Sequence, residues 1–287
     1  MEIRHPNKDE LDQMKRLWTK CFHDPEDYVD FYYQNGYKDS RTLVSVEDDG
    51  TVSAMLTIFP SLLYTKTSIY KGGYLYAVAT HPRFRRQGYM ARLEERACRE
   101  VLKFGGKYVT LVPASPELFS MYQKLGYQSR YSLYHSTVTL EEIQSKNSLT
   151  NLSEIGESYF IPLRQLFLNS FSESVQFDGY MQHYCYEEML KTGCRALSVQ
   201  NRFGHGYIVF YLEDGELYIK EAGMKKECFE AALYSIAKRL QVTQIHIRSA
   251  VPFFHGAQQI PYGMMKCLDD SVRLSEGSHI YMNLMLD

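Results

Sequence analysis

The segment Tyr74–Leu93, YLYAVATHPRFRRQGYMARL, constrains the fold more than any other part of this 287-residue chain. Its apolar run, which ends at Val78–Thr80, predicts a strand that stops before a proline. An arginine-rich turn follows, and a helix is predicted from about Gly88. The first N–H groups of a helix lack intrahelical partners and lie at the positive end of its dipole. The segment therefore predicts a phosphate or pyrophosphate site, to which Arg85 and Arg86 add permanent charge.

The elements around this turn predict an α/β unit. Periodic apolar residues indicate an early helix to about Cys21, and two strands are expected at Thr42–Glu47 and Thr51–Lys66, around an Asp-Asp-Gly turn. After the arginine turn the helix is expected to end at two glycines, and Tyr108–Val112 reads as a buried strand. This succession is a βαβ-type unit with the turn at the carboxyl end of a strand, where ligands bind in open α/β sheets.

The second half of the chain repeats this order in a shorter form. Between Leu217 and Ile245 the spacing is about six residues shorter than between Leu75 and Val109, and the arginine turn is what has gone. We therefore expect an α/β (α+β) fold of two tandem units, with mixed, mostly antiparallel sheets flanked by helices. The catalytic unit is expected over residues 1–144 and a degenerate second unit over residues 145–287.

Composition excludes several classes of protein. A formal net charge of −2 argues against a general nucleic-acid binder, which needs a basic face. The first residues lack the apolar core of a signal peptide, and the longest apolar stretch is interrupted by Pro60, so neither export nor a membrane span is expected. The six cysteines form no C-x-x-C pair and the nine histidines form no H-x-x-x-H pair, so no metal site is expected. We expect a cytoplasmic protein.

The turn also resembles a known family. Its spacing Arg85-x-x-Gly88-x-Met90-Ala91 resembles the acyl-CoA loop of the GCN5-related N-acetyltransferase (GNAT) superfamily. Met90 stands where that family usually has glycine or alanine. The form of the loop and the doubled architecture resemble the tandem-domain acetyltransferases related to the enhanced-intracellular-survival (Eis) proteins. Those relatives commonly carry a further domain and use a C-terminal carboxylate as base, and we do not transfer that role to Asp287.

A second motif supports the same resemblance. Tyr122 to Tyr127 reads Tyr-x-x-x-Gly-Tyr, as in the short helix that follows the fifth strand of GNAT enzymes. The resemblance implies that Tyr122 points at the sulfur of CoA and protonates the leaving thiolate as a general acid, a role that suits a phenol with a pKa near 10. It also implies acetyl-CoA as co-substrate. The residues expected to bind it are Val78, Ala79, Thr80, Arg85, Arg86, Gln87, Gly88, Tyr89, Met90, Ala91 and Ser115.

The general base is not identified by the sequence. The strand Tyr74–Thr80 contains no carboxylate, which leaves Tyr76 acting through water or an acid from the early helices as candidates. The segment Asp24–Tyr37 mixes acids with aromatic residues; it either lines the acceptor site or is an amphipathic helix with its aromatic side chains in the core.

The activity expected is transfer of acetyl from acetyl-CoA to a primary amine on a small molecule or peptide, by direct attack in a ternary complex. The alternative is a non-catalytic acyl-CoA binding or sensing protein. A third hypothesis is an aminoacyl transferase supplied by charged tRNA. Such an enzyme would not need the CoA turn, and it would be expected to carry a more basic surface. Neither nucleic acid nor membrane is an expected partner, and a homo-oligomer is compatible with the sequence.

Overall fold

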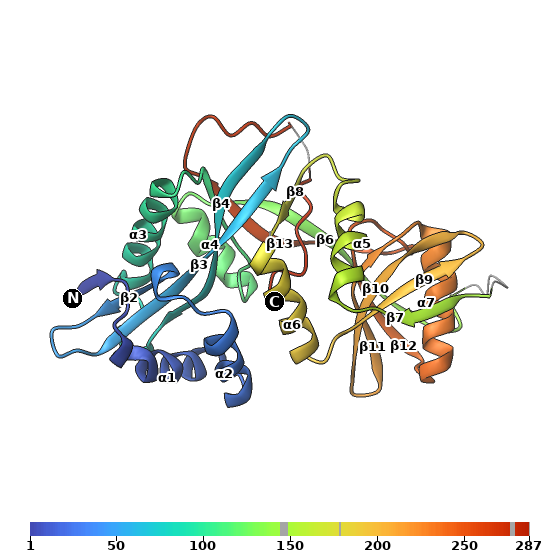
Figure 1. The fold of residues 1–287 in the computed structure, drawn as a ribbon, viewed down its shortest axis with the longest axis horizontal. Coiled ribbons are helices and arrows are strands. Elements are labelled where there is room, and N and C mark those ends of the chain that lie inside the picture. Colours follow the sequence, from blue (N-terminus) through green and yellow to red (C-terminus); the bar gives the residue numbers. More distant parts are fainter. Residues whose placement is uncertain (144–148, 178, 276–278, 287) are drawn as a thin grey trace. The chain divides into compact units, whose positions relative to one another are not determined.

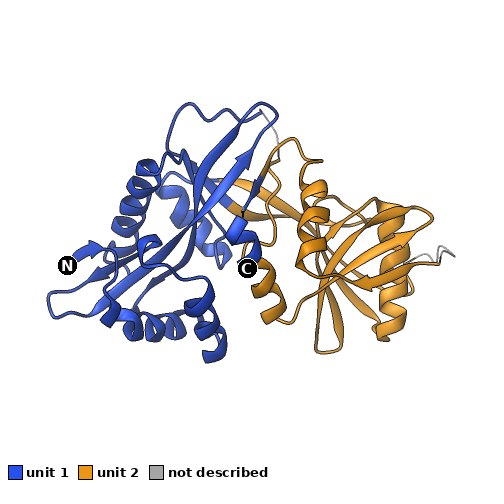
Figure 2. Ribbon diagram, in the orientation of Figure 1, with its two compact units in different colours: residues 1–128, 175–184, 264–276 blue, residues 129–174, 185–263, 277–287 orange. Residues whose placement is uncertain are grey.

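The computed structural model describes residues 1–143, 149–177, 179–275 and 279–286, and the chain divides into two compact units (Figures 1 and 2). Unit 1 comprises residues 1–128, 175–184 and 264–276, and unit 2 comprises residues 129–174, 185–263 and 277–287. The boundary predicted between residues 144 and 145, and the terminal Asp287, lie outside the described residues.

The sheet of unit 1 has the strand order β1-β2-β3-β4-β5-β13. β4 and β5 pair in parallel, whereas the other neighbours in this order are antiparallel. The last four residues of β13, Met264–Cys267, complete the edge beside β5. The bounds are Glu2–Arg4 for β1, Thr42–Val46 for β2, Val52–Tyr64 for β3, Ile69–Thr80 for β4, Tyr108–Leu111 for β5 and Gln258–Cys267 for β13.

Helices cover both faces of this sheet (Figure 1). α3 and α4 pack on one face through apolar side chains such as Leu93, Val101 and Tyr122, which meet Leu56 and Leu75 of the strands. α1 and α2 pack on the other face. The bounds are Leu11–Phe22 for α1, Glu26–Asn35 for α2, Tyr89–Lys103 for α3 and Pro116–Lys124 for α4; short 3₁₀ helices span Lys8–Glu10, Asp39–Arg41 and Pro82–Phe84, and β8, Ser174–Gln176, pairs with β3.

The strands of unit 2 form a layer with the order β6-β12-β11-β10-β9-β7. α7 packs on one face, where its Phe229 and Leu233 meet Leu217 and Ile245, and α5 packs on the other through Phe160 and Phe167. The bounds are Gln128–Thr139 for β6, Asn151–Glu154 for β7, Arg195–Asn201 for β9, Gly204–Glu213 for β10, Glu216–Gly223 for β11, Gln244–Ser249 for β12, Glu157–Leu168 for α5, Gly179–Lys191 for α6 and Lys226–Leu240 for α7.

The two units share an order of elements. β10, β11, α7 and β12 follow one another as β3, β4, α3 and β5 do, and both helices connect a parallel pair of strands. β4 ends at Thr80 and α3 begins at Tyr89, whereas β11 ends at Gly223 and α7 begins at Lys226. The connection in unit 2 is thus too short for an arginine turn. The predicted fold class, mixed and mostly antiparallel sheets flanked by helices, is confirmed.

The described residues from Ile280 form no regular strand. The tail from Ile280 reads as an alternating strand, but within its described residues only an isolated bridge between Tyr281 and Ser174 forms. The reason is the Tyr281 side chain, which is drawn into the interior of unit 2 because its hydroxyl donates to the buried carboxylate of Glu221 at 2.7 Å. A buried side-chain hydrogen bond therefore holds this part of the chain in place of strand pairing.

Candidate active site

The end of β4 departs from regular strand geometry. The register between β3 and β4 shifts between Met55 and Thr57, and Ala77 has a positive φ of 50°, so β4 carries a bulge there. Its parallel pairing with β5 covers only the stretch from Gly72 to Tyr74. Beyond Tyr74 the two strands separate, and backbone groups of β4 on that side become available to a ligand.

The turn after β4 is built to expose N–H groups. Pro82 begins a 3₁₀ turn, and His81 caps it because its Nδ1 accepts the N–H of Arg83 at 3.2 Å. Arg86 has a φ of 62° and Gly88 a φ of 83°, so the backbone turns through the left-handed region twice before α3 starts. Gly88 occupies the N-cap of α3 and has no side chain to bond the first N–H groups. The helix terminus is therefore open to an anion.

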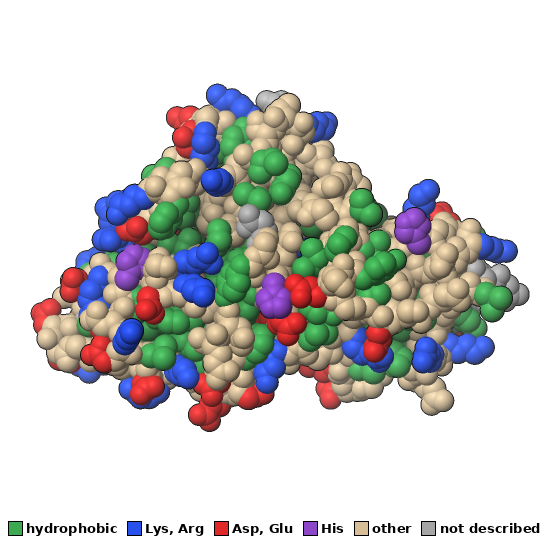
Figure 3. All heavy atoms as spheres, viewed as in Figure 1, with side chains coloured by type: hydrophobic (Ala, Val, Ile, Leu, Met, Phe, Trp, Pro, Cys, Tyr) green, Lys and Arg blue, Asp and Glu red, His purple; other side chains and the backbone are tan. Residues whose placement is uncertain are grey.

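The two arginines of the turn differ in their surroundings. Arg85 is held against the strand end, since its Nε donates to the Thr80 carbonyl at 3.1 Å and its guanidinium lies 3.7 Å from the Cys21 sulfur. Arg86 is exposed, and among the described residues no hydrogen bond ties its side chain to the strand end. Figure 3 shows that Lys and Arg side chains are interspersed with Asp and Glu on the drawn face, so the positive charge of the turn is a local feature.

A cavity of about 740 Å³ lies where β4, the turn, α3 and α4 meet. It is mainly apolar, with Leu118 and Met121 of α4 on one side. The predicted site residues that line it are Val78, Ala79, Thr80, Arg85, Arg86, Gly88, Tyr89, Met90, Ala91 and Tyr122.

Three predicted residues need separate comment. Gln87 does not line the cavity, because its side chain donates to the Arg83 carbonyl at 3.1 Å. Ser115 also lies outside it, at the N-cap of α4. Met90, the departure from the GNAT pattern, packs partly against the apolar core of α3. Its side chain is therefore half-buried against the core while Met90 also lines the cavity.

Tyr122 is the buried polar group of this cavity. Its side chain is only 5% exposed, and its ring packs at 5.5 Å from the ring of Tyr127. Burial, and secondarily the charge of Glu94, raise the pKa of Tyr122 well above its usual value. The phenol therefore stays protonated at neutral pH and can donate a proton or hydrogen bond into the cavity.

Glu94 is a buried group near Tyr122 that the sequence did not indicate. This α3 carboxylate is 2% exposed and accepts hydrogen bonds from Lys266 Nζ and from the Cys98 thiol, both at 3.0 Å. Lys266 lies 5.7 Å from the centroid of the Tyr127 ring, which packs against Tyr122. The sequence carries one local signal of this cluster, which is a glutamate that interrupts the apolar face of a predicted helix. Lys266 adds no local signal because it comes from the distant strand β13.

The opposite face of β4 is aromatic. Tyr32 and Tyr33 of α2 are buried, so the core interpretation of the Asp24–Tyr37 segment is correct for them. Asp24 accepts the Trp18 indole N–H at 2.7 Å, and it is therefore committed to the packing of α1. Tyr76 is half-buried, and its hydroxyl lies 3.0 Å from that of Tyr28. These two phenols are the polar groups that β4 and α2 bring together on this face.

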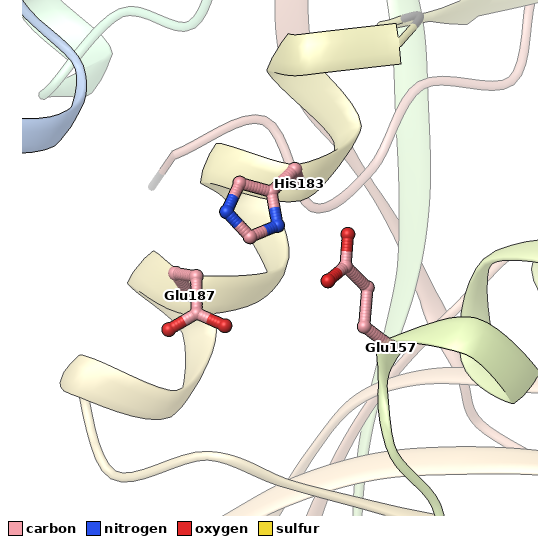
Figure 4. A group of neighbouring side chains, drawn as sticks. All are labelled: Glu157, His183 and Glu187. Atoms are coloured by element: carbon pink, nitrogen blue, oxygen red, sulfur yellow. The ribbon is translucent and has the colours of Figure 1, made fainter.

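Three further side chains are drawn in Figure 4. His183 and Glu187 lie one turn apart on α6, and Glu157 is the first residue of α5. His183 belongs to unit 1 and both glutamates to unit 2. Acidic side chains beside a histidine are common on protein surfaces that hold no ion, and nothing further in the described residues marks a metal centre here.

The site defines a class of protein. A bulged strand that parts from its parallel neighbour, an uncapped helix terminus with arginines, and a buried phenol at one cavity suit an acyl-CoA-dependent acyltransferase. Residues 2–130 match the family described as the acetyltransferase (GNAT) domain. This part of the chain belongs to the GNAT superfamily, as the resemblance of its arginine turn predicted.

Solved structures share the fold over most of the chain. A GCN5-related N-acetyltransferase from Anabaena variabilis superposes with a TM-score of 0.76 at 15% identity, covering 93% of this chain and 73% of that one. Eis1 from Mycobacterium abscessus gives 0.70 at 12% identity, with 94% and 74% covered. N-myristoyltransferase of Saccharomyces cerevisiae, solved with bound myristoyl-CoA, gives 0.54 at 10% identity, with 86% and 72% covered. No curated protein matches the sequence. None of the described helices is long and apolar enough to cross a membrane.

Proposed function

We propose that this protein is a cytoplasmic N-acetyltransferase that transfers acetyl from acetyl-CoA to a primary amine of a small molecule or peptide. The observation that carries the proposal is the convergence of the β4 bulge, the arginine turn and Tyr122 on one cavity. Bound myristoyl-CoA in the yeast neighbour supports a thioester of CoA as the donor. The turn would hold the pyrophosphate, and the gap between β4 and β5 would receive the acyl end.

The proposed reaction is direct attack in a ternary complex. The amine nitrogen bonds to the thioester carbonyl carbon, and a backbone N–H freed near Ala77 and Val78 stabilises the oxyanion. The C–S bond then breaks, and Tyr122 donates its proton to the sulfur. The amine proton leaves on the aromatic face of β4, where Tyr76 and Tyr28 are the candidates for a relay through water.

One observation keeps the alternative of a non-catalytic acyl-CoA sensor. The strand β4, IYKGGYLYAVAT, contains no carboxylate to serve as base. A turnover assay separates the two functions because a sensor binds CoA thioesters without releasing free thiol.

The test is an acetyl-CoA turnover screen that detects free thiol, run against polyamines, aminoglycosides, amino acids and peptides. Tyr122→Phe should bind acetyl-CoA with nearly unchanged affinity and turn over about 100-fold more slowly, the size of effect expected for loss of a general acid. Tyr70→Phe, which removes a phenol from the exposed start of β4, is the matched control. Equal rates for wild type and Tyr122→Phe would remove Tyr122 from the mechanism. Tight binding with no acceptor and no thiol release would favour the sensor.

A further inference from the structure

Unit 2 has a cavity of its own, of about 810 Å³, lined by residues of that unit alone. Its floor is the sheet face opposite α7. Leu217, Ile219, Ile245 and Ile247 belong to the core beneath α7, and the alternating residues of β11 and β12 therefore point to the other side. None of the residues that line it was singled out by the sequence patterns.

The first row of side chains in this cavity is aromatic. Tyr211, Tyr218 and His246 are cross-strand neighbours on β10, β11 and β12. The two tyrosine rings stack at 4.9 Å and 14°, and Tyr218 stacks on the imidazole of His246 at 4.4 Å and 16°. His246 is fixed at both nitrogens, by Glu216 at 2.7 Å and by the Thr137 hydroxyl at 3.1 Å. The row is thus a preorganised aromatic wall in which the rings stack face to face, so their edges line the cavity.

The second row is cationic. Lys220 and Arg248 follow Tyr218 and His246 by two residues on the same strands and also line the cavity. His135 of β6 pairs in register with Arg248 and lies beside them. The pairing of β11 with β12 stops at Ile219, so the strands part where these cations stand.

A bulge places Lys220 in this row. On β10, Val209 pairs with Glu221 and Phe210 pairs with Ile219, so Lys220 is the extra residue. The backbone carbonyl of Lys220 accepts the Arg248 Nε–H at 3.4 Å. The neighbouring carboxylate of Glu221 is bound in the interior by Arg164, Tyr207 and Tyr281.

We propose that this cavity binds a small molecule that carries a carboxylate or phosphate beside a flat ring. Lys220 and Arg248 would hold the anionic group by charge-assisted hydrogen bonds, and the ring would pack against the wall of Tyr211, Tyr218 and His246. A concave site with a few convergent polar groups and an aromatic wall is typical of small-molecule sites. The proposal is independent of acyl transfer, because every residue in it belongs to unit 2.

The test is calorimetric titration of the full chain with four probes: phenyl phosphate, benzoate, inorganic phosphate and benzyl alcohol. We expect one of the ring-bearing anions to bind at least tenfold more tightly than inorganic phosphate and benzyl alcohol, which each carry only half of the recognised chemistry. Phenyl phosphate and benzoate together decide whether phosphate or carboxylate is preferred.

Variants locate the binding. Arg248→Gln and Lys220→Gln should each weaken it about tenfold or more, as expected for loss of a hydrogen bond to a charged group. Arg239→Gln, on the exposed side of α7, should leave it unchanged. Melting curves by circular dichroism show whether the variants fold. If either Arg248→Gln or Lys220→Gln fails to fold, the other variant still tests the cationic row. Absence of binding by both ring-bearing anions would overturn the proposal, as would an affinity in both Arg248→Gln and Lys220→Gln equal to that of the wild-type protein.

Discussion

Glu94 shows how a single residue can connect stability with the candidate chemistry. Its carboxylate is buried on α3, bonded by Lys266 and Cys98, and its charge contributes to the raised pKa of Tyr122. A buried carboxylate without its cation is costly, whereas removing both partners of a pair is much less so. The pair is therefore expected to behave non-additively.

A double-mutant cycle tests this expectation. Lys266→Met should lower the free energy of unfolding by about 3 kcal/mol because it leaves the Glu94 charge buried without its cation. Adding Glu94→Leu should restore part of that loss. Urea denaturation of the two single variants and the double variant gives the interaction energy. Strictly additive effects would mean that the two groups do not act as a pair.

At the residue scale, the sequence is informative where the pattern is local. Tyr122 and the Arg85 to Ala91 spacing could be singled out because each motif lies within a few residues of sequence. The partner of Glu94 could not be found this way, since Lys266 is 172 residues further along the chain. The family resemblance also implied Gln87 and Ser115, and these two residues do not line the cavity that the others line.

At the scale of elements, the arginine turn is the connection that distinguishes the two βαβ-like units. Replacing Arg86 with Gln and Gly88 with Ala together should weaken acetyl-CoA binding about 10- to 100-fold. The first change removes a charge-assisted contact and the second places a side chain at a φ of 83°. Calorimetry measures the affinity, and Arg99→Gln on the exposed side of α3 is the control. An unchanged dissociation constant would exclude the turn as the phosphate site.

The attachment of α5 to the sheet of unit 2 should depend on pH. Burial opposes ionisation of Glu221, which is 1% exposed, but the charge and hydrogen bonds of Arg164, with the hydroxyls of Tyr207 and Tyr281, bring its pKa below the usual value of 4.5. A carboxyl whose pKa is lowered by folding contributes stability above its unfolded pKa and loses it as pH falls through the folded one.

Unfolding free energy should therefore fall as pH drops below about 4.5, the range in which unfolded glutamate takes up its proton. Glu221→Gln should be less stable than wild type at pH 7 and should show a flatter decline in acid. Glu154→Gln, which alters an exposed pair with Arg195, should follow the wild-type curve. Equal acid slopes for wild type and Glu221→Gln would contradict this assignment. Denaturant titrations between pH 3 and pH 7 measure all three proteins.

At the scale of the whole molecule, unit 1 is not continuous in sequence. The sequence patterns predicted the order of strands and helices from β2 to β5, because local periodicity and turn residues indicate each of these elements. They could not show that β5 takes its antiparallel neighbour from Met264–Cys267, because strand pairing leaves no local signal when the partner is distant. The same segment supplies the cation for Glu94.

A fragment of residues 1–144 should therefore not behave as an independent catalytic domain. It keeps the arginine turn and Tyr122, but it loses the β13 residues that pair with β5, which leaves that strand as an unpaired edge. It also leaves Glu94 of α3 without Lys266. The fragment therefore loses both the strand pairing of β5 and the ion pair of Glu94, and each loss is destabilising. We expect the fragment to melt at least 10 °C lower than the full chain or to aggregate, which follows from a loss of about 3 kcal/mol in a domain of this size. Circular dichroism and size-exclusion chromatography measure both outcomes. A fragment with the melting temperature of the full chain would show that the segment from Met264 is dispensable, and that the strand order of unit 1 does not determine its stability.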